Sequence, residues 1–292
     1  MASSKVEREE AENQLKYDLK KFYDGPFIEW CGDLSSQGIL EPEEVKVKLW
    51  PENVINNSKE YRSEPTYRQF SINLPYGRSP MVLLQAVLSK TLCQNFLQDP
   101  HFLIEGTETS YNSTESRVKG LAYETSAVDD GGVDRRIEMV ESLDNFISRN
   151  PNLATKKAKE FIQKFNFLLK QEVIEQDIQD LANIFLEFGR LALRLWKNYA
   201  DIKVHLLPEF AEKRFNAGSP LMEADVIRSQ PFPKFMNDLP IGVIIRPLIK
   251  SVPLKQGDEA TKDIVLLKAV VYTPDFTSNN DEICDGSHYS FV

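Results

Sequence analysis

The clearest pattern in the chain is a helical rhythm of apolar side chains between residues 136 and 200. Apolar residues that recur every three or four positions share one face of a helix. The rhythm predicts a first helix over 137–147, a second over 158–168 and a third over 174–199. The apolar positions of the third are Ile174, Ile178, Leu181, Phe185, Phe188, Ala192, Leu195 and Tyr199, widened by Ile184, Leu191 and Trp196. A stripe this wide favours packing inside a helical bundle over a free coiled coil.

Two more helices are predicted in the N-terminal half. The segment 4–23 has an apolar stripe of Ala11, Leu15, Leu19 and Phe22, and Gly25-Pro26 is expected to stop it. From there to about residue 65 the chain reads as mostly irregular. Ser79-Pro80 opens a second helix that runs to about residue 97, since proline is well tolerated at the first helical position. This helix is apolar on most sides and is therefore expected to be buried.

Strands are predicted on both sides of the helical region. Alternating residues indicate short strands at 45–49 and 70–74, and 204–207 reads as another. Two apolar runs, 242–249 and 263–273, flank a polar turn and predict an antiparallel pair. Pro247 has no backbone N–H, so the first run is expected to lie at a sheet edge or to be bulged there. The predicted fold class is α+β, with a helical bundle over 136–200 packed on a small, mostly antiparallel sheet from N- and C-terminal strands.

Composition divides the chain into four segments. Residues 1–105 form a mixed α/β part, 136–200 the helical bundle, and 201–292 a C-terminal strand pair with a polar tail. Residues 106–135 lack apolar periodicity and are rich in polar residues and glycine, which is typical of a flexible loop or linker. The other three segments are expected to share one core, so we predict one compact unit.

Charge and composition narrow the classes of function. The 292 residues include 44 acidic and 35 basic side chains, a net charge of -9, and 41% are hydrophobic. A chain with this negative charge lacks the positive electrostatic field that attracts proteins to nucleic acids, so a nucleic acid is not an expected partner. No run of 18 apolar residues and no apolar leader occur in the sequence, so neither a membrane span nor a signal peptide is predicted. With an odd number of cysteines, three, we expect a cytoplasmic protein, with the nucleus as the alternative.

No motif identifies a catalytic centre. The glycine-rich nucleotide loops, the serine nucleophile elbow and the His-Glu-x-x-His zinc motif do not occur. Cys284, Asp285 and His288 could chelate a metal on paper, but they lie in the polar tail. The aspartates of 129–134 flank two glycines that disfavour a helix, so this segment reads as a solvated turn. We therefore predict no metal site and no cofactor and assign no catalytic residue, and the enzyme question stays open.

The remaining reactive side chains have structural interpretations. Cys31 follows an aromatic residue and Cys93 falls within the apolar 79–97 helix, and both read as small buried hydrophobes rather than nucleophiles. His205 lies between two apolar residues and reads as a core or edge histidine.

Charge is unevenly distributed along the chain. Residues 1–150 carry 25 acidic and 17 basic side chains, whereas residues 151–292 carry 19 and 18. The second half contains a local basic run of Lys156, Lys157, Lys159, Lys164 and Lys170, opposed there by Glu160. Such a run reads as a solvated helix face or as a site for an acidic partner.

Two functions from different classes follow. The first is a non-catalytic interaction or assembly protein that binds another protein or a second copy of itself through an apolar helix face. The alternative is an enzyme or binding protein for a small apolar molecule in a cavity between helices and sheet. For the first function, the predicted contact residues are Phe185, Phe188, Leu195 and Trp196, with Lys156, Lys157 and Lys159 orienting the partner.

Overall fold

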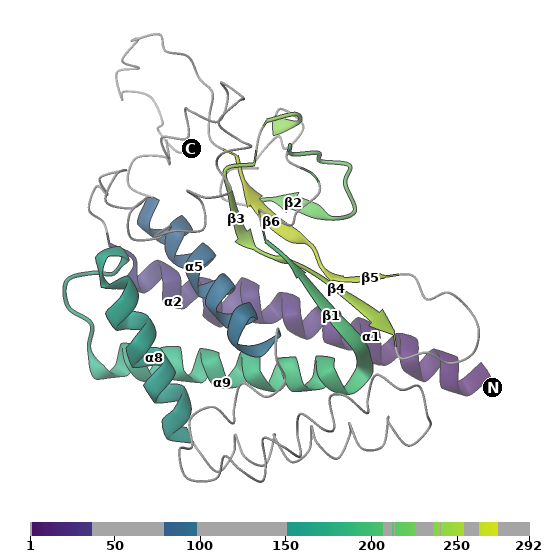
Figure 1. Ribbon diagram of the computed structural model, residues 1–292, viewed down its shortest axis with the longest axis horizontal. Helices are drawn as coiled ribbons and strands as arrows, with labels where there is room; N and C mark the ends of the chain where they lie inside the picture. Colours follow the sequence, from purple (N-terminus) through teal and green to yellow (C-terminus); the bar gives the residue numbers. More distant parts are fainter. Residues whose placement is uncertain are drawn as a thin grey trace, which may run out of the picture.

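Helices packed on two small sheets make up the fold (Figure 1). A computed structural model describes residues 2–36, 79–97, 151–206, 212, 214–225, 236–239, 241–253 and 263–273. The helices are α1 (Ala2–Phe22), α2 (Ile28–Leu34), α5 (Ser79–Phe96), α8 (Pro151–Phe165) and α9 (Glu175–Asn198). The strands are β1 (Tyr199–His205), β2 (Met222–Ala224), β3 (Val243–Arg246), β4 (Leu248–Pro253), β5 (Ile264–Leu267) and β6 (Ala269–Tyr272). The predicted α+β class is confirmed.

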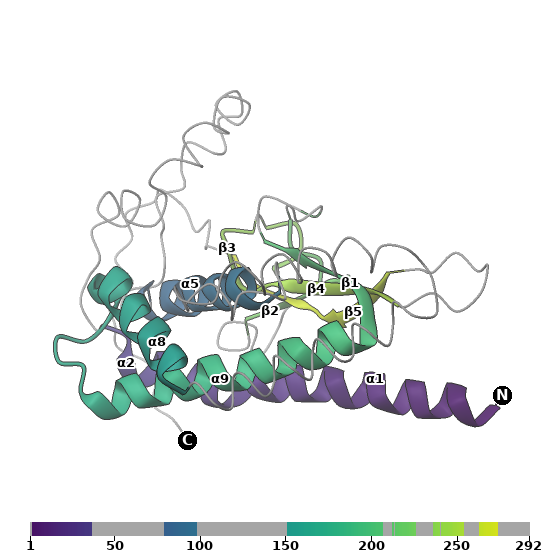
Figure 2. The same cartoon turned by 60° about the horizontal axis from the view of Figure 1, so that its bottom comes forward.

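The long helix α9 organises the core, as its periodicity predicted. Figure 2 shows α9 and α1 running side by side, with β1, β4 and β5 lying over them. Asp177 accepts a hydrogen bond from the Ile174 backbone N–H at 3.0 Å, which supplies an oxygen to the start of the helix. Trp30 of α2 donates through Nε1 to the Asp177 carbonyl at 2.9 Å and fixes this end against α2. At the other end Tyr199, predicted to be helical, is already the first residue of β1.

The basic helix α8 and the apolar helix α5 complete the bundle. The second predicted helix of the 136–200 region is α8, followed by a 3₁₀ turn over Asn166–Leu168. The helix predicted after Ser79-Pro80 is α5, and it is buried as expected, since most of its residues have little exposed surface. The helix predicted over 137–147 lies outside the described residues, as do the strands at 45–49 and 70–74 and the loop at 106–135.

The regular helix α1 ends at Phe22, next to the stop predicted at Gly25-Pro26, but residues 28–34, which were predicted to be irregular, form a second helix. Between the two helices the backbone kinks within Tyr23–Phe27, where Gly25 has non-helical angles of φ -115° and ψ -110°. Proline lacks an N–H and breaks the helical hydrogen-bond ladder, so a kink forms at this point. Residues 28–34 continue as a helix because Trp30, Cys31 and Leu34 are buried in the core.

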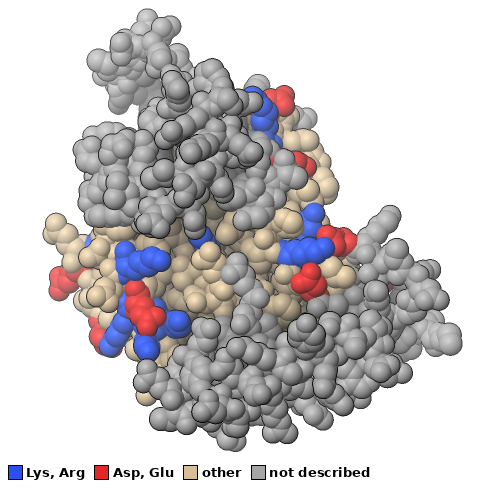
Figure 3. All heavy atoms as spheres, in the orientation of Figure 1, with Lys and Arg blue, Asp and Glu red and all other residues tan. Residues whose placement is uncertain are grey.

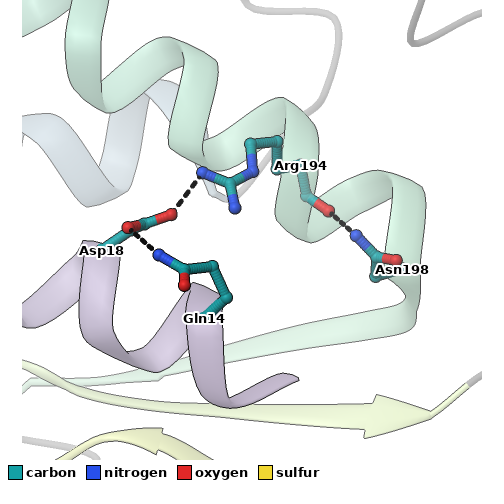
Figure 4. Close-up of polar contacts among 4 residues, drawn as sticks. All are labelled: Gln14, Asp18, Arg194 and Asn198. Atoms are coloured by element: carbon teal, nitrogen blue, oxygen red, sulfur yellow. Dashed lines mark hydrogen bonds and ion pairs between the residues drawn. The ribbon is translucent and has the colours of Figure 1, made fainter. Parts of the chain in front are cut away.

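Only part of the predicted α1 stripe is buried. Leu15, Leu19 and Phe22 lie in the core, whereas Ala11 is exposed, because the beginning of α1 extends past the end of α9 (Figure 2). A rim contact between the two helices joins Arg194 Nη1 to Asp18 Oδ2 at 2.6 Å (Figure 4). Gln14 donates to the same carboxylate at 2.8 Å.

The C-terminal strands form a bent antiparallel hairpin. Strand β4 pairs with β1 and β5 in one sheet, all antiparallel, while the second sheet has the order β2-β6-β3 with β2 parallel to β6. The predicted antiparallel pair is therefore confirmed, and the strand predicted at 204–207 is the end of the longer β1. Pro247 separates β3 from β4, and the pairing register shifts on both sides of it, so the predicted bulge is present. None of the described helices is long and apolar enough to cross a bilayer.

Candidate functional site

The four apolar side chains predicted to bind a partner are inside the protein. Phe185 is 1% exposed, Phe188 and Leu195 are 0% and Trp196 is 8%. The Phe188 ring contacts the rings of Phe22, Tyr23 and Phe96, and Trp196 Nε1 donates to the Phe96 carbonyl at 3.1 Å. These contacts join α9 to α1 and α5, so in this conformation the four residues serve the chain's own core.

The three predicted lysines are at the surface. Lys156 and Lys159 are exposed and Lys157 is half-buried on α8, whose opposite side buries Ala154, Ala158, Phe161 and Phe165. Lys157 lies 3.8 Å from Glu160, and Lys159 lies 3.7 Å from Glu175 at the start of α9. Exposed pairs at such distances contribute little to stability. The structure thus separates the predicted site, with the lysines outside and the apolar residues inside.

A polar junction that the sequence did not reveal lies where α1 kinks. The Arg246 side chain at the end of β3 is only 5% exposed, and it reaches two carboxylates on different elements. Its Nη1 lies 3.0 Å from Asp24 Oδ1 in the kink after α1, and its Nη2 donates to Glu223 Oε1 on β2. Its Nε has no hydrogen-bond partner among the described residues. A buried guanidinium requires such compensation, because an unpaired charge in the interior is costly.

A bulge in β3 aims Arg246 inward. Ile244 pairs with Val271 of β6, whereas Arg246 pairs with Val270, so Ile245 is an extra residue in the ladder. Such a bulge lets neighbouring side chains leave the regular alternation, and residues 244, 245 and 246 are all buried. In the sequence, Arg246 stands out as a charged residue within an apolar run and next to Pro247. That position could have suggested a buried charge, but the sequence does not show which carboxylates pair with it.

Tyr23 and two residues of α5 lie behind the guanidinium. Arg246 Cζ is 5.8 Å from the centre of the Tyr23 ring, a cation–π contact. The Tyr23 hydroxyl lies 3.8 Å from Cys93 Sγ, while Ser89 and the charge of Arg246 act to lower the pKa of Tyr23. Burial dominates, however, and with Cys93 it raises the pKa of Tyr23 well above its ordinary value. Burial also raises the pKa of Cys93 to about 12, so both groups are neutral at physiological pH.

The other reactive residues give no catalytic arrangement among the described parts of the chain. Cys31 is completely buried, which raises the pKa of its thiol well above the usual value and disfavours the nucleophilic thiolate. His205 ends the edge strand β1, and its buried Nε2 has no described hydrogen-bond partner. The described residues contain no group of three side chains able to hold a metal ion. Cys284, Asp285 and His288 and the aspartates of 129–134 lie outside them.

Comparisons of the chain with protein-family models, with curated protein sequences and with solved structures gave no match.

Proposed function

We propose that the protein is a non-catalytic interaction or assembly protein that contacts an acidic partner through the outer face of α8. The observation that carries this proposal is the placement of Lys156, Lys157 and Lys159 on the outside of a helix whose other side is packed in the core. The packed side holds the backbone in place, so the lysines are displayed in a defined arrangement.

The charge of this face supports an acidic partner. Residues 151–165 contain four lysines and one glutamate, which gives a net charge of +3 (4 minus 1). The chain as a whole has a net charge of -9. Figure 3 shows basic side chains gathered on the side of the molecule that carries α8, with acidic ones between them. Opposite charge on a partner speeds association and fixes its orientation more than it adds affinity. A partner with several exposed carboxylates, including a second copy of this acidic chain, fits that face.

The test is native mass spectrometry of gently purified protein, combined with sedimentation at low and high salt. We expect multiples of 33.5 kDa or a stoichiometric second protein, released as salt is raised. The double variant Lys156→Glu, Lys159→Glu should weaken the complex by about tenfold or more, since like charges then face each other.

A matched control reverses two exposed lysines on other helices, Lys20 of α1 and Lys90 of α5. The control Lys20→Glu, Lys90→Glu makes the same change in net charge and should leave the complex intact. A complex that survives the α8 reversal, or falls equally with the control, overturns the proposal. So does a bare monomer.

The polar junction favours a second candidate, the binding or conversion of a small molecule between helices and sheet. Arg246, Tyr23 and Cys93 come together at that boundary, and Arg246 Nε has no described partner. Small-molecule sites commonly combine apolar walls with a few such polar groups. The same mass spectrum distinguishes this candidate, because a monomer carrying roughly a few hundred daltons of extra mass indicates a bound ligand.

A further inference from the structure

We infer that the face formed by α8 and the start of α9 binds a second copy of the same chain around a two-fold axis. The inference rests on the proposed function, and it names the partner of the α8 face. That face combines an exposed apolar side chain, carboxylates beside it in the chain, and lysines on the adjacent helix. In a two-fold contact, the lysines of each copy can face the carboxylates of the other.

The apolar centre of this face is Ile174, the residue that precedes α9. Its side chain is 53% exposed, although most apolar side chains of α9 are buried. Ile174 occupies the N-cap position, where serine, threonine, aspartate and asparagine are preferred because their oxygens accept a backbone hydrogen bond. An isoleucine side chain cannot accept one, so it stabilises neither the helix start nor the core. An exposed apolar residue that breaks a local rule without a gain inside the chain is a candidate contact for a partner.

Side chains of opposite charge lie next to each other on this face. Lys156 and Lys159 are exposed on α8, and Glu172 and Glu175 are exposed on either side of Ile174 in the chain. The two groups are adjacent in space, since Lys159 Nζ lies 3.7 Å from Glu175 Oε1. The side chains of that pair are 56% and 77% exposed, so both remain accessible to a partner. Figure 3 shows basic and acidic side chains close together on the side of the molecule that carries α8.

This mixture of charges favours a second copy over an unrelated acidic protein. A purely acidic partner would attract the lysines but would be repelled by the carboxylates beside them. A copy rotated by 180° presents carboxylates to the lysines and lysines to the carboxylates, at both ends of the contact. The two Ile174 side chains then lie near the axis and bury their exposed surface against each other.

The experiment exchanges charges between copies of the full chain. The variant Lys156→Glu, Lys159→Glu and the variant Glu172→Lys, Glu175→Lys should each dimerise about tenfold or more weakly than the wild type, because like charges then face each other. Mixing the two variants should restore the dimer, since both contacts of the mixed pair again join opposite charges. Sedimentation measures the affinities, and native mass spectrometry with one variant labelled with nitrogen-15 identifies the mixed dimer.

The variant Ile174→Ser tests the apolar centre separately. Asp177 already accepts the Ile174 backbone N–H at 3.0 Å, and a serine oxygen would supply the reciprocal acceptor of a capping box. The melting temperature should therefore stay the same or rise, whereas dimerisation should weaken by about tenfold or more because two apolar side chains are lost from the contact. The matched control Tyr17→Ser removes a side chain that is 60% exposed on α1 and should leave the dimer intact.

Failure of the inference can be distinguished from failure of the proposed function. If the wild type binds a different protein through the α8 lysines, or if the mixed variants form no dimer, the proposed function can hold but the inference is wrong. Full dimerisation of Ile174→Ser, or an equal loss in Tyr17→Ser, also overturns the inference, and this pair of variants decides alone if a charge variant does not fold. A wild-type monomer with no bound protein overturns both.

Discussion

The helices of the core are joined to one another and to the sheet β2-β6-β3 by different kinds of contact. Rings of Phe22, Phe96, Phe161, Phe185 and Phe188 pack against one another and join α1, α5, α8 and α9 through apolar surface. Strand β3 of that sheet packs along α5, and the buried guanidinium with two carboxylates lies at this boundary beside a small apolar cluster. Apolar burial is insensitive to the charge state of its neighbours, whereas a buried ion pair depends on every partner. A change of charge at this boundary is therefore expected to disturb the sheet β2-β6-β3 before it disturbs the helical core.

A related contrast appears between α1 and the turn that follows it. Asp18 meets Arg194 at the rim, where the arginine side chain is 47% exposed, while Asp24 meets an almost fully buried Arg246. The chemistry is the same in both pairs. Burial of the arginine distinguishes a contact of small expected effect from one whose loss would leave an uncompensated charge in the interior.

The largest expected loss of stability comes from placing charge in the helical core. Phe188→Asp together with Leu195→Asp buries two carboxylates at positions that are 0% exposed, and we expect the protein to unfold, since total stability is about 5–15 kcal/mol. Circular dichroism with thermal melting measures this. The control is Tyr17→Asp on α1, an aromatic residue that is 60% exposed, for which a change within about 0.5 kcal/mol is expected. A folded double variant that has lost only partner binding would instead restore α9 as a contact surface.

Alkaline pH should weaken the helical core next. Cys31, Cys93 and Tyr23 all have folded-state pKa values raised by burial, that of Cys93 to about 12 from 9.0. Below about pH 9 these groups are neutral in both states, so their contribution is constant. As pH rises from 9 toward 12, the unfolded chain ionises first, and stability falls. Urea unfolding across this range measures the slope.

A variant isolates the part of the alkaline effect that comes from one thiol. In Cys93→Ala the decline between pH 9 and 12 should be shallower than in the wild type, although the variant is less stable at every pH because it loses packed volume. A parallel decline in the two proteins would show that the Cys93 thiol does not contribute to it.

The smallest expected effect concerns the exposed ion pair of α1. Arg194→Ala removes the 2.6 Å contact with Asp18, and we expect a loss of about 0.2–1 kcal/mol that shrinks in high salt. Chemical denaturation at two salt concentrations measures it, with hydrogen exchange in β2, β3 and β6 unchanged. A larger effect, or faster exchange in these strands, would show that this pair contributes more than an exposed ion pair does.

The longer helices could be predicted from the sequence, since each depends on contacts along its own length, whereas the short α2 was missed because its burial depends on the packed core. The three-and-four spacing of α9, the Ser79-Pro80 start of α5 and the break at Pro247 all identified elements that the structure contains. Most apolar positions predicted for α9 are also buried, and Phe185 and Phe188 lie in the core. Periodicity does not say whether an apolar face is covered by the same chain or by a partner, so it could not decide the site.

The polar junction was decided by the tertiary structure alone. Asp24, Glu223 and Arg246 lie up to 222 positions apart, and they meet because a kink, a short parallel strand and a bulged strand converge. The sequence determined which segments form helices and strands, since local sterics and hydrophobic periodicity act over a few residues. The pairing of charges required the packed fold, because only packing brings distant residues into one desolvated place and makes their interaction strong.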